Sequence, residues 1–142
     1  GRLARDNGII ACFHPHAQTA VYTQEEIQLF LDNTDPALVS LCLDTAHTAI
    51  AGMDVVAAFR RWMDRIAYVH LKDVDPDLEK YDNPMKAFCE LGIGTVDFRG
   101  VHKALKEHGY DGVLCVELDH RPVCNYKSAM ISRQYLHNAL GF

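Results

Sequence analysis

The chain has 142 residues, of which 49% are hydrophobic and 23% are charged, and its formal net charge is −5. This composition is ordinary for one globular domain. The acidic balance offers no basic stripe for phosphates, so nucleic acid is not an expected partner. Apolar runs are too short to span a bilayer, so no membrane is expected as a partner. The five cysteines include no C-x-x-C pair, which indicates a reducing compartment and predicts a cytoplasmic protein.

Short apolar runs alternate with amphipathic helical patterns along the chain. After a helix tail at residues 1–7, the pattern predicts strands at about 9–14, 39–43, 66–70 and 112–117. It predicts helices that begin at Thr23 and that cover about 54–64, 98–108 and 126–139. Helix-end signals are the capping box of Thr23 and Glu26, the N-caps Asp54 and Asp97, and the stop at Gly109. Residues 73–97 are expected to form a long connection with one short helical piece at about 85–90.

The predicted strands are continuously apolar, which is typical of a parallel sheet covered on both faces. Their alternation with helices predicts the α/β class. No glycine-rich phosphate loop follows the first strand, which weighs against a dinucleotide-binding sheet. Polar residues at the carboxyl end of each strand instead favour a (β/α)8 barrel, whose active sites lie on that face.

The length of the chain limits how much of a barrel it can form. A complete barrel needs about 250 residues, so residues 1–142 are expected to form a single partial (β/α)8 barrel domain with parallel strands and outer helices. An isolated sheet of four parallel strands would expose two edges and one apolar face. We therefore expect a partner half or self-association to cover them.

Each of the four apolar runs ends on a residue type that binds metals. These residues are His14, Asp44, His70 and Glu117. Because the carboxyl ends of parallel strands meet at one edge of a sheet, we expect the four side chains to converge. Two imidazoles and two carboxylates suit a divalent metal such as Mn²⁺, Co²⁺ or Zn²⁺. His16 is the alternative to His14, because either histidine of H-P-H could reach the ion, and a solvated loop is the alternative for both.

Two further motifs surround these positions. L-D-T-A-H places His47 three residues after Asp44, where a loop is expected, and both side chains could face one pocket. An aspartate alone at such a place is often only a cap. H-L-K-D places Lys72 just beyond His70, and the alternative is a core histidine followed by a solvated lysine.

Glu117 follows an apolar strand, where a carboxylate is costly to bury without a cation. A metal ion is one such cation. The alternative is a salt bridge to Arg121 or Lys72.

With these residues the chain resembles the sugar isomerase/epimerase superfamily with a xylose isomerase-like barrel, and within it most closely the inosose dehydratases of myo-inositol catabolism. The matching stretches are, in chain order, F-H-P-H-A-Q-T, T-Q-E-E-I, N-T-D-P-A-L-V-S-L-C-L-D-T-A-H, R-I-A-Y-V-H-L-K-D-V, G-I-G-T-V-D-F and G-Y-D-G-V-L-C-V-E. The resemblance implies the C-terminal half of the barrel, units 5–8, with a missing N-terminal half. It implies metal ligation by Asp44, His70 and Glu117, with His14 or His16 completing the set. The superfamily usually has a glutamate where this chain has His14.

The resemblance also implies a chemistry: a keto-inositol loses water through an enediolate that a divalent metal stabilises. The substrate would be a small polyol or sugar. His16 and His47 are the candidates for proton transfer, since unperturbed imidazole titrates near working pH. Lys72 would stabilise oxyanion charge or bind a substrate hydroxyl.

Other functions stay open at this stage. A sugar isomerase or epimerase would use the same enediolate, and an inactive half-barrel fragment is a further alternative. An endonuclease of the same barrel class is disfavoured by the acidic charge.

Overall fold

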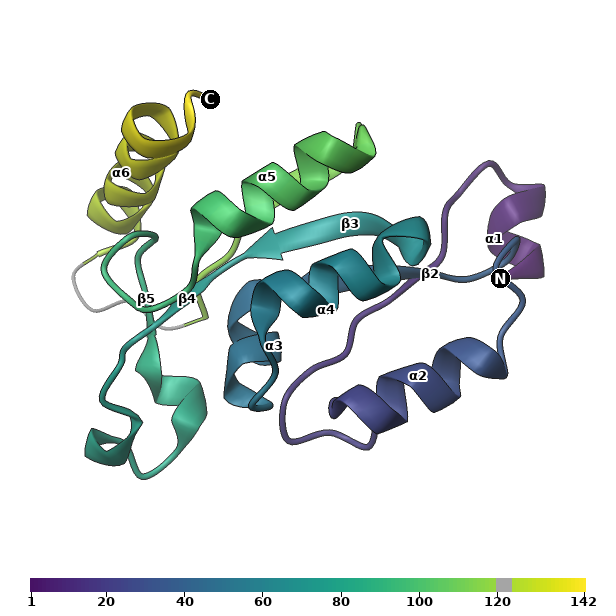
Figure 1. The fold of residues 1–142 in the computed structure, drawn as a ribbon, viewed down its shortest axis with the longest axis horizontal. Coiled ribbons are helices and arrows are strands. Elements are labelled where there is room, and N and C mark those ends of the chain that lie inside the picture. The colour runs from purple at the N-terminus through teal and green to yellow at the C-terminus, as the bar shows by residue number, and fades with distance from the viewer. Residues whose placement is uncertain (120–123) are drawn as a thin grey trace.

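The main sheet has four parallel strands in the spatial order β1-β2-β3-β6 (Figure 1). The fold is taken from a computed structural model, which describes residues 1–119 and 124–142. The strands are β1 (Cys12–Phe13), β2 (Ser40–Asp44), β3 (Ile66–Leu71) and β6 (Val113–Val116). Their order in space follows their order in the chain, as in the wall of a barrel, whereas a doubly wound sheet reverses it.

Helices and short turns connect these strands. The helices are α1 (Arg2–Asp6), α2 (Gln24–Asp32), α3 (Thr45–Ile50), α4 (Val55–Trp62), α5 (Phe98–His108) and α6 (Asn125–Tyr135), with a π-helical turn at Leu136–Leu140. Short 3₁₀ turns occur at Met63–Arg65, Leu78–Lys80 and Pro84–Ala87. A small antiparallel hairpin pairs β4 (Asp73–Val74) with β5 (Phe88–Cys89). In the part of the chain that the structure describes, no helix is long and apolar enough to cross a membrane.

Local signals in the sequence set the helix ends. The Thr23 side chain accepts from the Glu26 amide, and the Glu26 carboxylate accepts from the Thr23 amide at 2.9 Å, so the predicted capping box is confirmed. The Asp54 side chain caps α4. Gly109 ends α5 with φ of 76°, a conformation that favours glycine.

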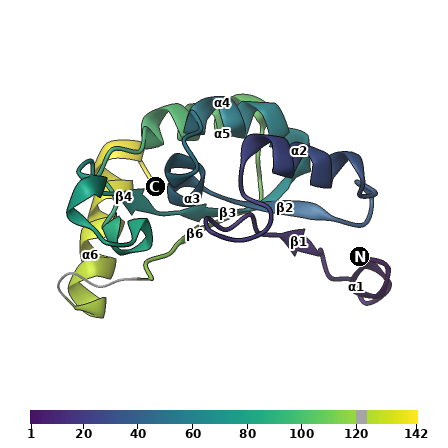
Figure 2. The ribbon, with the colours of Figure 1, turned by 90° about the horizontal axis from the view of Figure 1, so that it is seen from below.

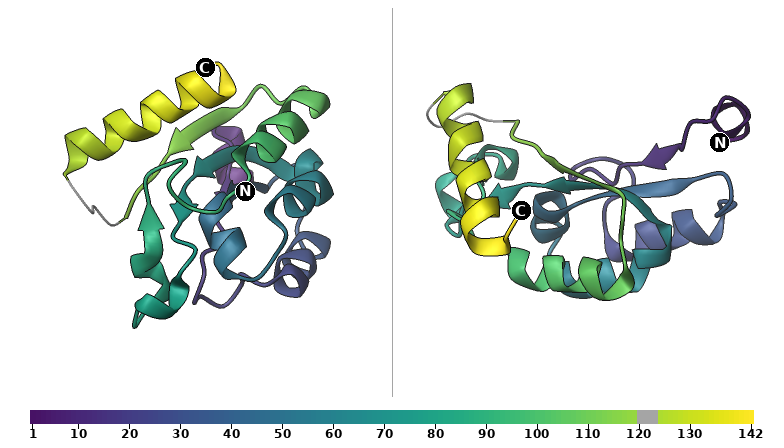
Figure 3. Two further views of the ribbon diagram at one scale, coloured as in Figure 1. Left: turned by 60° about the vertical axis from the view of Figure 1, so that its left-hand side comes forward. Right: turned by 90° about the horizontal axis from the view of Figure 1, so that it is seen from above.

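One face of the sheet is covered by α2, α4 and α5 (Figures 2 and 3). Leu43 and Val69 are paired in register and belong to the core under these helices. At the edge of the sheet, Phe13 stacks on Phe30 of α2 with ring centroids 4.0 Å apart. The apolar runs of the sequence therefore bury one side of each strand against the predicted outer helices.

No helix of the described residues covers the opposite face of the sheet (Figures 2 and 3). Ile10 and Val113 are 69% and 52% exposed, and Cys12 is exposed. Cys42 pairs in register with Tyr68, and Tyr68 pairs with Val113, so the side chains of these three residues share this open face. Side chains two residues apart share a face of a strand, so Asp44 lies on it as well, although Cys42 and Asp44 are themselves buried.

The structure differs from the sequence prediction at four places. The short helical piece expected at about 85–90 is a 3₁₀ turn at Pro84–Ala87 followed by β5 at Phe88–Cys89. The first strand is only Cys12–Phe13, shorter than the predicted 9–14. His47 lies in α3 and not in a loop, because the Asp44 side chain caps a helix of six residues that starts directly after the strand. The β4–β5 hairpin was not predicted, since two residues per strand are too few to show an alternating pattern.

Candidate metal centre

The carboxyl ends of the four parallel strands bring the predicted metal ligands together. Asp44 and His70 are partners in register on β2 and β3. His14 follows β1 directly, and Glu117 follows β6 directly. One ligand atom from each of the four residues lies within 4.8 Å of the others.

Three atoms of this set are buried and make no hydrogen bond to any described residue. They are Oδ2 of Asp44, Nδ1 of His70 and Oε2 of Glu117. His70 Nδ1 lies 2.9 Å from the Glu117 oxygen and 3.7 Å from the Asp44 oxygen, but without hydrogen-bond geometry. Buried polar atoms are nearly always satisfied, and a divalent cation between them would satisfy all three. The residues present therefore fit a metal ion.

The two oxygens of Asp44 have different environments. Oδ1 accepts hydrogen bonds from the amides of Ala46 and His47 at 2.7 and 2.9 Å, which caps α3. Oδ2 makes no hydrogen bond within the described residues and lies 3.4 Å from the Lys72 ammonium, so it faces the place of a cation. Burial raises the pKa of Asp44, and the nearby ammonium of Lys72 opposes this rise. The capping role and the ligand role that we weighed for this residue are thus compatible.

His14 is oriented by the backbone of the neighbouring strand. Its Nδ1 lies 3.1 Å from the Cys42 carbonyl oxygen. A carbonyl accepts, so the ring proton sits on Nδ1 and Nε2 is left free to bind a metal. Burial lowers the pKa of His14, which favours the neutral imidazole that a metal requires.

Lys72 is fully buried, so the alternative of a solvated surface lysine is wrong. Its Nζ lies 2.6 Å from Glu117 Oε2, 2.7 Å from Asp119 Oδ2 and 3.4 Å from Asp44 Oδ2. Burial disfavours the charged ammonium, but the carboxylates, Asp44 foremost, outweigh it and raise the pKa of Lys72. The ion pair weighed as an alternative for Glu117 is therefore present with Lys72, while Arg121 and the neighbouring His120 lie outside the described residues.

His16 and His47 form a second group beside this one. Their ring centroids are 3.9 Å apart, and they lie with Asp119 in a second set of possible metal ligands. Burial, the Lys72 ammonium and the neighbouring imidazoles lower the pKa of His47 to about 2. His47 is therefore neutral at working pH, which differs from the expectation based on a free imidazole.

Asp73 is a buried residue whose role the sequence analysis missed. Its carboxylate accepts four backbone hydrogen bonds of 2.9–3.0 Å, from Val74, Gly92, Gly94 and Val96. Burial raises the pKa of Asp73, and these N–H groups oppose that rise. Asp73 thus fixes the loop of residues 92–96 next to the site, and the two glycines of G-I-G-T were the available signal.

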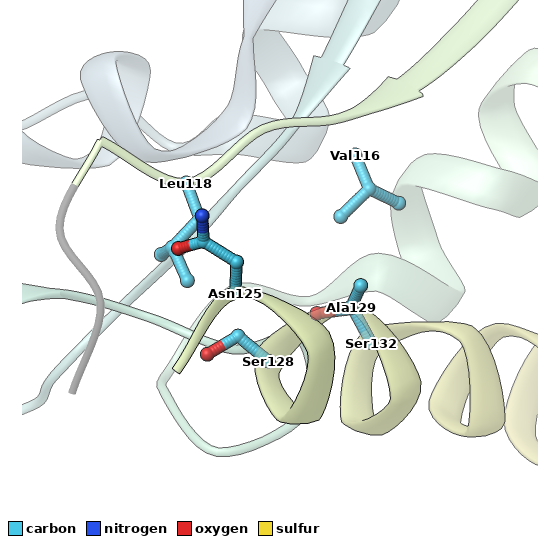
Figure 4. A pocket seen from close by; sticks show the side chains of 6 residues that line it. All are labelled: Val116, Leu118, Asn125, Ser128, Ala129 and Ser132. Carbon is cyan, nitrogen blue, oxygen red and sulfur yellow. The ribbon is translucent and has the colours of Figure 1, made fainter. Parts of the chain in front are cut away.

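A cavity of about 140 Å³ lies elsewhere, between β6 and α6 (Figure 4). Its lining residues are Val116, Leu118, Asn125, Ser128, Ala129 and Ser132. Ser128 donates to the buried carboxylate of Glu90 at 2.6 Å. None of the predicted site residues lines this cavity, so it is separate from the candidate metal centre.

Comparison with known proteins gives a consistent family. Residues 1–136 match the family model described as xylose isomerase-like TIM barrel. An inosose dehydratase of Clostridium beijerinckii is 35% identical, over 100% of this chain and 52% of its own length. The probable 3-DHS dehydratase AsbF of Bacillus anthracis has the same fold, with a TM-score of 0.76 at 16% identity over 97% of this chain and 53% of its own. IolI, solved with a bound zinc atom, also has this fold, with a TM-score of 0.75 at 21% identity over 96% of this chain and 51% of its own. The chain spans about half the length of the curated relatives it matches.

Proposed function

The chain belongs to the family of xylose isomerase-like TIM barrels, and from that premise we propose that it is the metal-binding half of a dehydratase that acts on a keto-inositol. One observation carries the proposal: among the described residues, Asp44, His70 and Glu117 each have a buried atom without a matched hydrogen bond, and these atoms gather in one small volume beside the Lys72 ammonium. His14 supplies the fourth ligand. The similarity to inosose dehydratases supports the reaction class.

We further propose that these residues correspond to units 5–8, the C-terminal half of the barrel. The four parallel strands in sequential order support this assignment. The open face of the sheet, with the exposed side chains of Ile10 and Val113, is the face that the other strands of a complete barrel would cover. An N-terminal half such as the longer relatives have would supply that cover and the other wall of the substrate pocket, and self-association is the other arrangement that would do so.

A bound Mn²⁺, Co²⁺ or Zn²⁺ would polarise a ketone oxygen and favour an enediolate. The charged Lys72 ammonium is held at the same rim by Asp44, Glu117 and Asp119, where it would stabilise developing oxyanion charge or bind a substrate hydroxyl. His47, neutral at working pH, would orient a hydroxyl by hydrogen bonding. His16, half-buried and next to His47, is the proposed group for proton transfer.

The alternative function is a metal-dependent sugar isomerase or epimerase, which would use the same enediolate. Epimerases are among the proteins with this fold, for example a 3-keto-D-glucoside 4-epimerase of E. coli. An inactive half-barrel fragment is the other alternative, since half of the substrate wall is absent from these 142 residues.

The test is metal content and product analysis, on this chain and on a version extended to the length of the relatives. With bound metal, the extended protein should release water from inosose and leave ketohexoses unchanged. Epimer formation from ketohexoses without water loss would replace the dehydratase by the epimerase. Metal binding by both versions with activity in neither would identify an inactive protein, and failure of both to bind metal would refute the proposed site.

A further inference from the structure

Cys42 lies next to the proposed metal site, on the side toward the amino end of β2, which we call below the site. It precedes Asp44 by two residues on β2, so the two side chains share the open face of the sheet. Its neighbours Leu41 and Leu43 instead belong to the core under the helices. Cys42 is buried, with 7% of its surface exposed, but it lies outside that core and beside His14 and His70.

Two ligand sets overlap at this place. One ring nitrogen of His14, one of His70 and Sγ of Cys42 lie within 4.8 Å of one another. The same two histidines belong to the set with Asp44 and Glu117. The sets thus share two imidazoles and differ in offering either two carboxylates or one thiol.

We propose that His14 and His70 serve two overlapping cation positions, an upper one completed by Asp44 and Glu117 and a lower one completed by Cys42. The inference rests on the proposed metal site and adds to it a selection among ions. Carboxylates suit Mn²⁺, whereas thiolates select softer ions such as Zn²⁺, and the same chemistry applies to Cd²⁺. Binding at the lower position releases the Cys42 thiol proton to solvent, because the thiolate is the ligand.

The ion pairs of Lys72 support two separate positions. Among the described residues, its ammonium pairs with Asp44, Glu117 and Asp119. None of these belongs to the lower set. A cation at the upper position competes with Lys72 for two carboxylates, whereas a cation at the lower position leaves those ion pairs intact. Because both positions need the same two histidines, only one is filled at a time.

The first experiment titrates the metal-free protein with Cd²⁺ and records thiolate-to-metal charge-transfer absorption in the ultraviolet. The wild type should develop this band and release one proton per ion bound. Cys42→Ser and Cys42→Ala should lose the band, whereas Cys89→Ser, which changes a buried thiol in β5 outside both sets, should keep it. Cd²⁺ should also bind the two Cys42 variants more weakly than the wild type, because only the upper position, with His14, His70, Asp44 and Glu117, remains to them.

The second experiment follows Mn²⁺ by its electron paramagnetic resonance signal. Mn²⁺ should bind wild type and Cys42→Ser equally, and Cd²⁺ should displace it from the wild type. The inference would be overturned if the charge-transfer band persisted in both Cys42 variants, or if both variants bound Cd²⁺ as tightly as the wild type. Binding of Mn²⁺ by the wild type would in that case still support the proposed metal site. If the wild type did not bind Mn²⁺, both the proposed function and the proposal of two cation positions would be contradicted.

Discussion

Nζ of Lys72 lies 2.6 Å from Oε2 of Glu117, the oxygen that also faces His70 Nδ1. The Lys72 ammonium is therefore the counter-ion of two carboxylates, Asp44 and Glu117, that would also bind a metal. A metal ion at the proposed site would neutralise the same negative charge as the Lys72 ammonium, so the stability of the fold and the binding of metal should be coupled at this residue.

Lys72→Met tests this coupling. Removing one partner of a buried pair costs about 3–5 kcal/mol, and the lower end applies because Glu117 and Asp119 are 33% and 46% exposed. The metal-free variant should lose about 3 kcal/mol of unfolding free energy in urea, and Mn²⁺ should restore more stability than it adds to the wild type.

The matched control for Lys72→Met is Lys86→Met. Lys86 forms an exposed ion pair with Asp82 at 2.8 Å, and such pairs contribute about 0–1 kcal/mol. Equal losses in the two lysine variants, or an equal gain from Mn²⁺ in Lys72→Met and in the wild type, would show that Lys72 is not the counter-ion of the metal site.

Asp44→Asn separates the two roles of this residue. Asparagine keeps an oxygen that can cap α3 in place of Oδ1, but it removes the charge on Oδ2. We expect near-normal helix content by circular dichroism and a fall in metal affinity of about 10- to 100-fold or more. Metal retained after dialysis is the measurement, with His102→Ala on α5 as the control. Equal metal content in the two variants would contradict the assignment of Asp44.

Asp73→Asn tests how the loop of residues 92–96 is held. Asparagine has one accepting oxygen, so two of the four N–H groups now bound by Asp73 lose their partner. A hydrogen bond to a charged group contributes about 1.5–3 kcal/mol, so the loss near neutral pH should be about 3 kcal/mol or more. Hydrogen exchange should show the Gly92 and Gly94 amides losing protection.

The control for Asp73→Asn is the same change at an exposed site. Asp82→Asn should alter the unfolding free energy by no more than about 0.5 kcal/mol, because Asp82 is 75% exposed. A similar small effect at Asp73 would mean that the loop is held by other contacts.

Sequence reasoning succeeded where the cause of a structure lies within a few residues. The caps at Thr23 and Asp54 and the stop at Gly109 need only local hydrogen bonds or backbone freedom. The gathering of His14, Asp44, His70 and Glu117 follows from one assumption, a parallel sheet in sequential order. Their roles as ligands stay a prediction that the metal experiments test.

Sequence reasoning failed where contacts come from distant parts of the chain. The buried Lys72 ammonium pairs with Asp119, 47 residues away in the chain, as well as with Asp44 and Glu117. The donors to Asp73 come from a loop about 20 residues away, and no periodic pattern indicates them. The sequence also does not tell which face of a continuously apolar strand lies under the helices, so it did not place the buried Cys42 beside His14 and His70.

The buried imidazole of His47 should make the fold sensitive to acid. The pKa of His47 falls to about 2 in the folded protein through burial and the nearby Lys72, whereas an unfolded histidine titrates near about 6.5. Between these values the unfolded chain binds a proton that the folded protein does not, so stability is complete above pH ~6.5 and falls with decreasing pH by up to about 1.4 kcal/mol per pH unit. In metal-free protein, His47→Gln should show a smaller loss of unfolding free energy between pH ~6.5 and ~4.5 than the wild type, while His102→Gln on α5 is the control. Parallel pH curves for wild type and His47→Gln would mean that folding does not lower the pKa of His47, which would remove the basis for its assignment as a permanently neutral group.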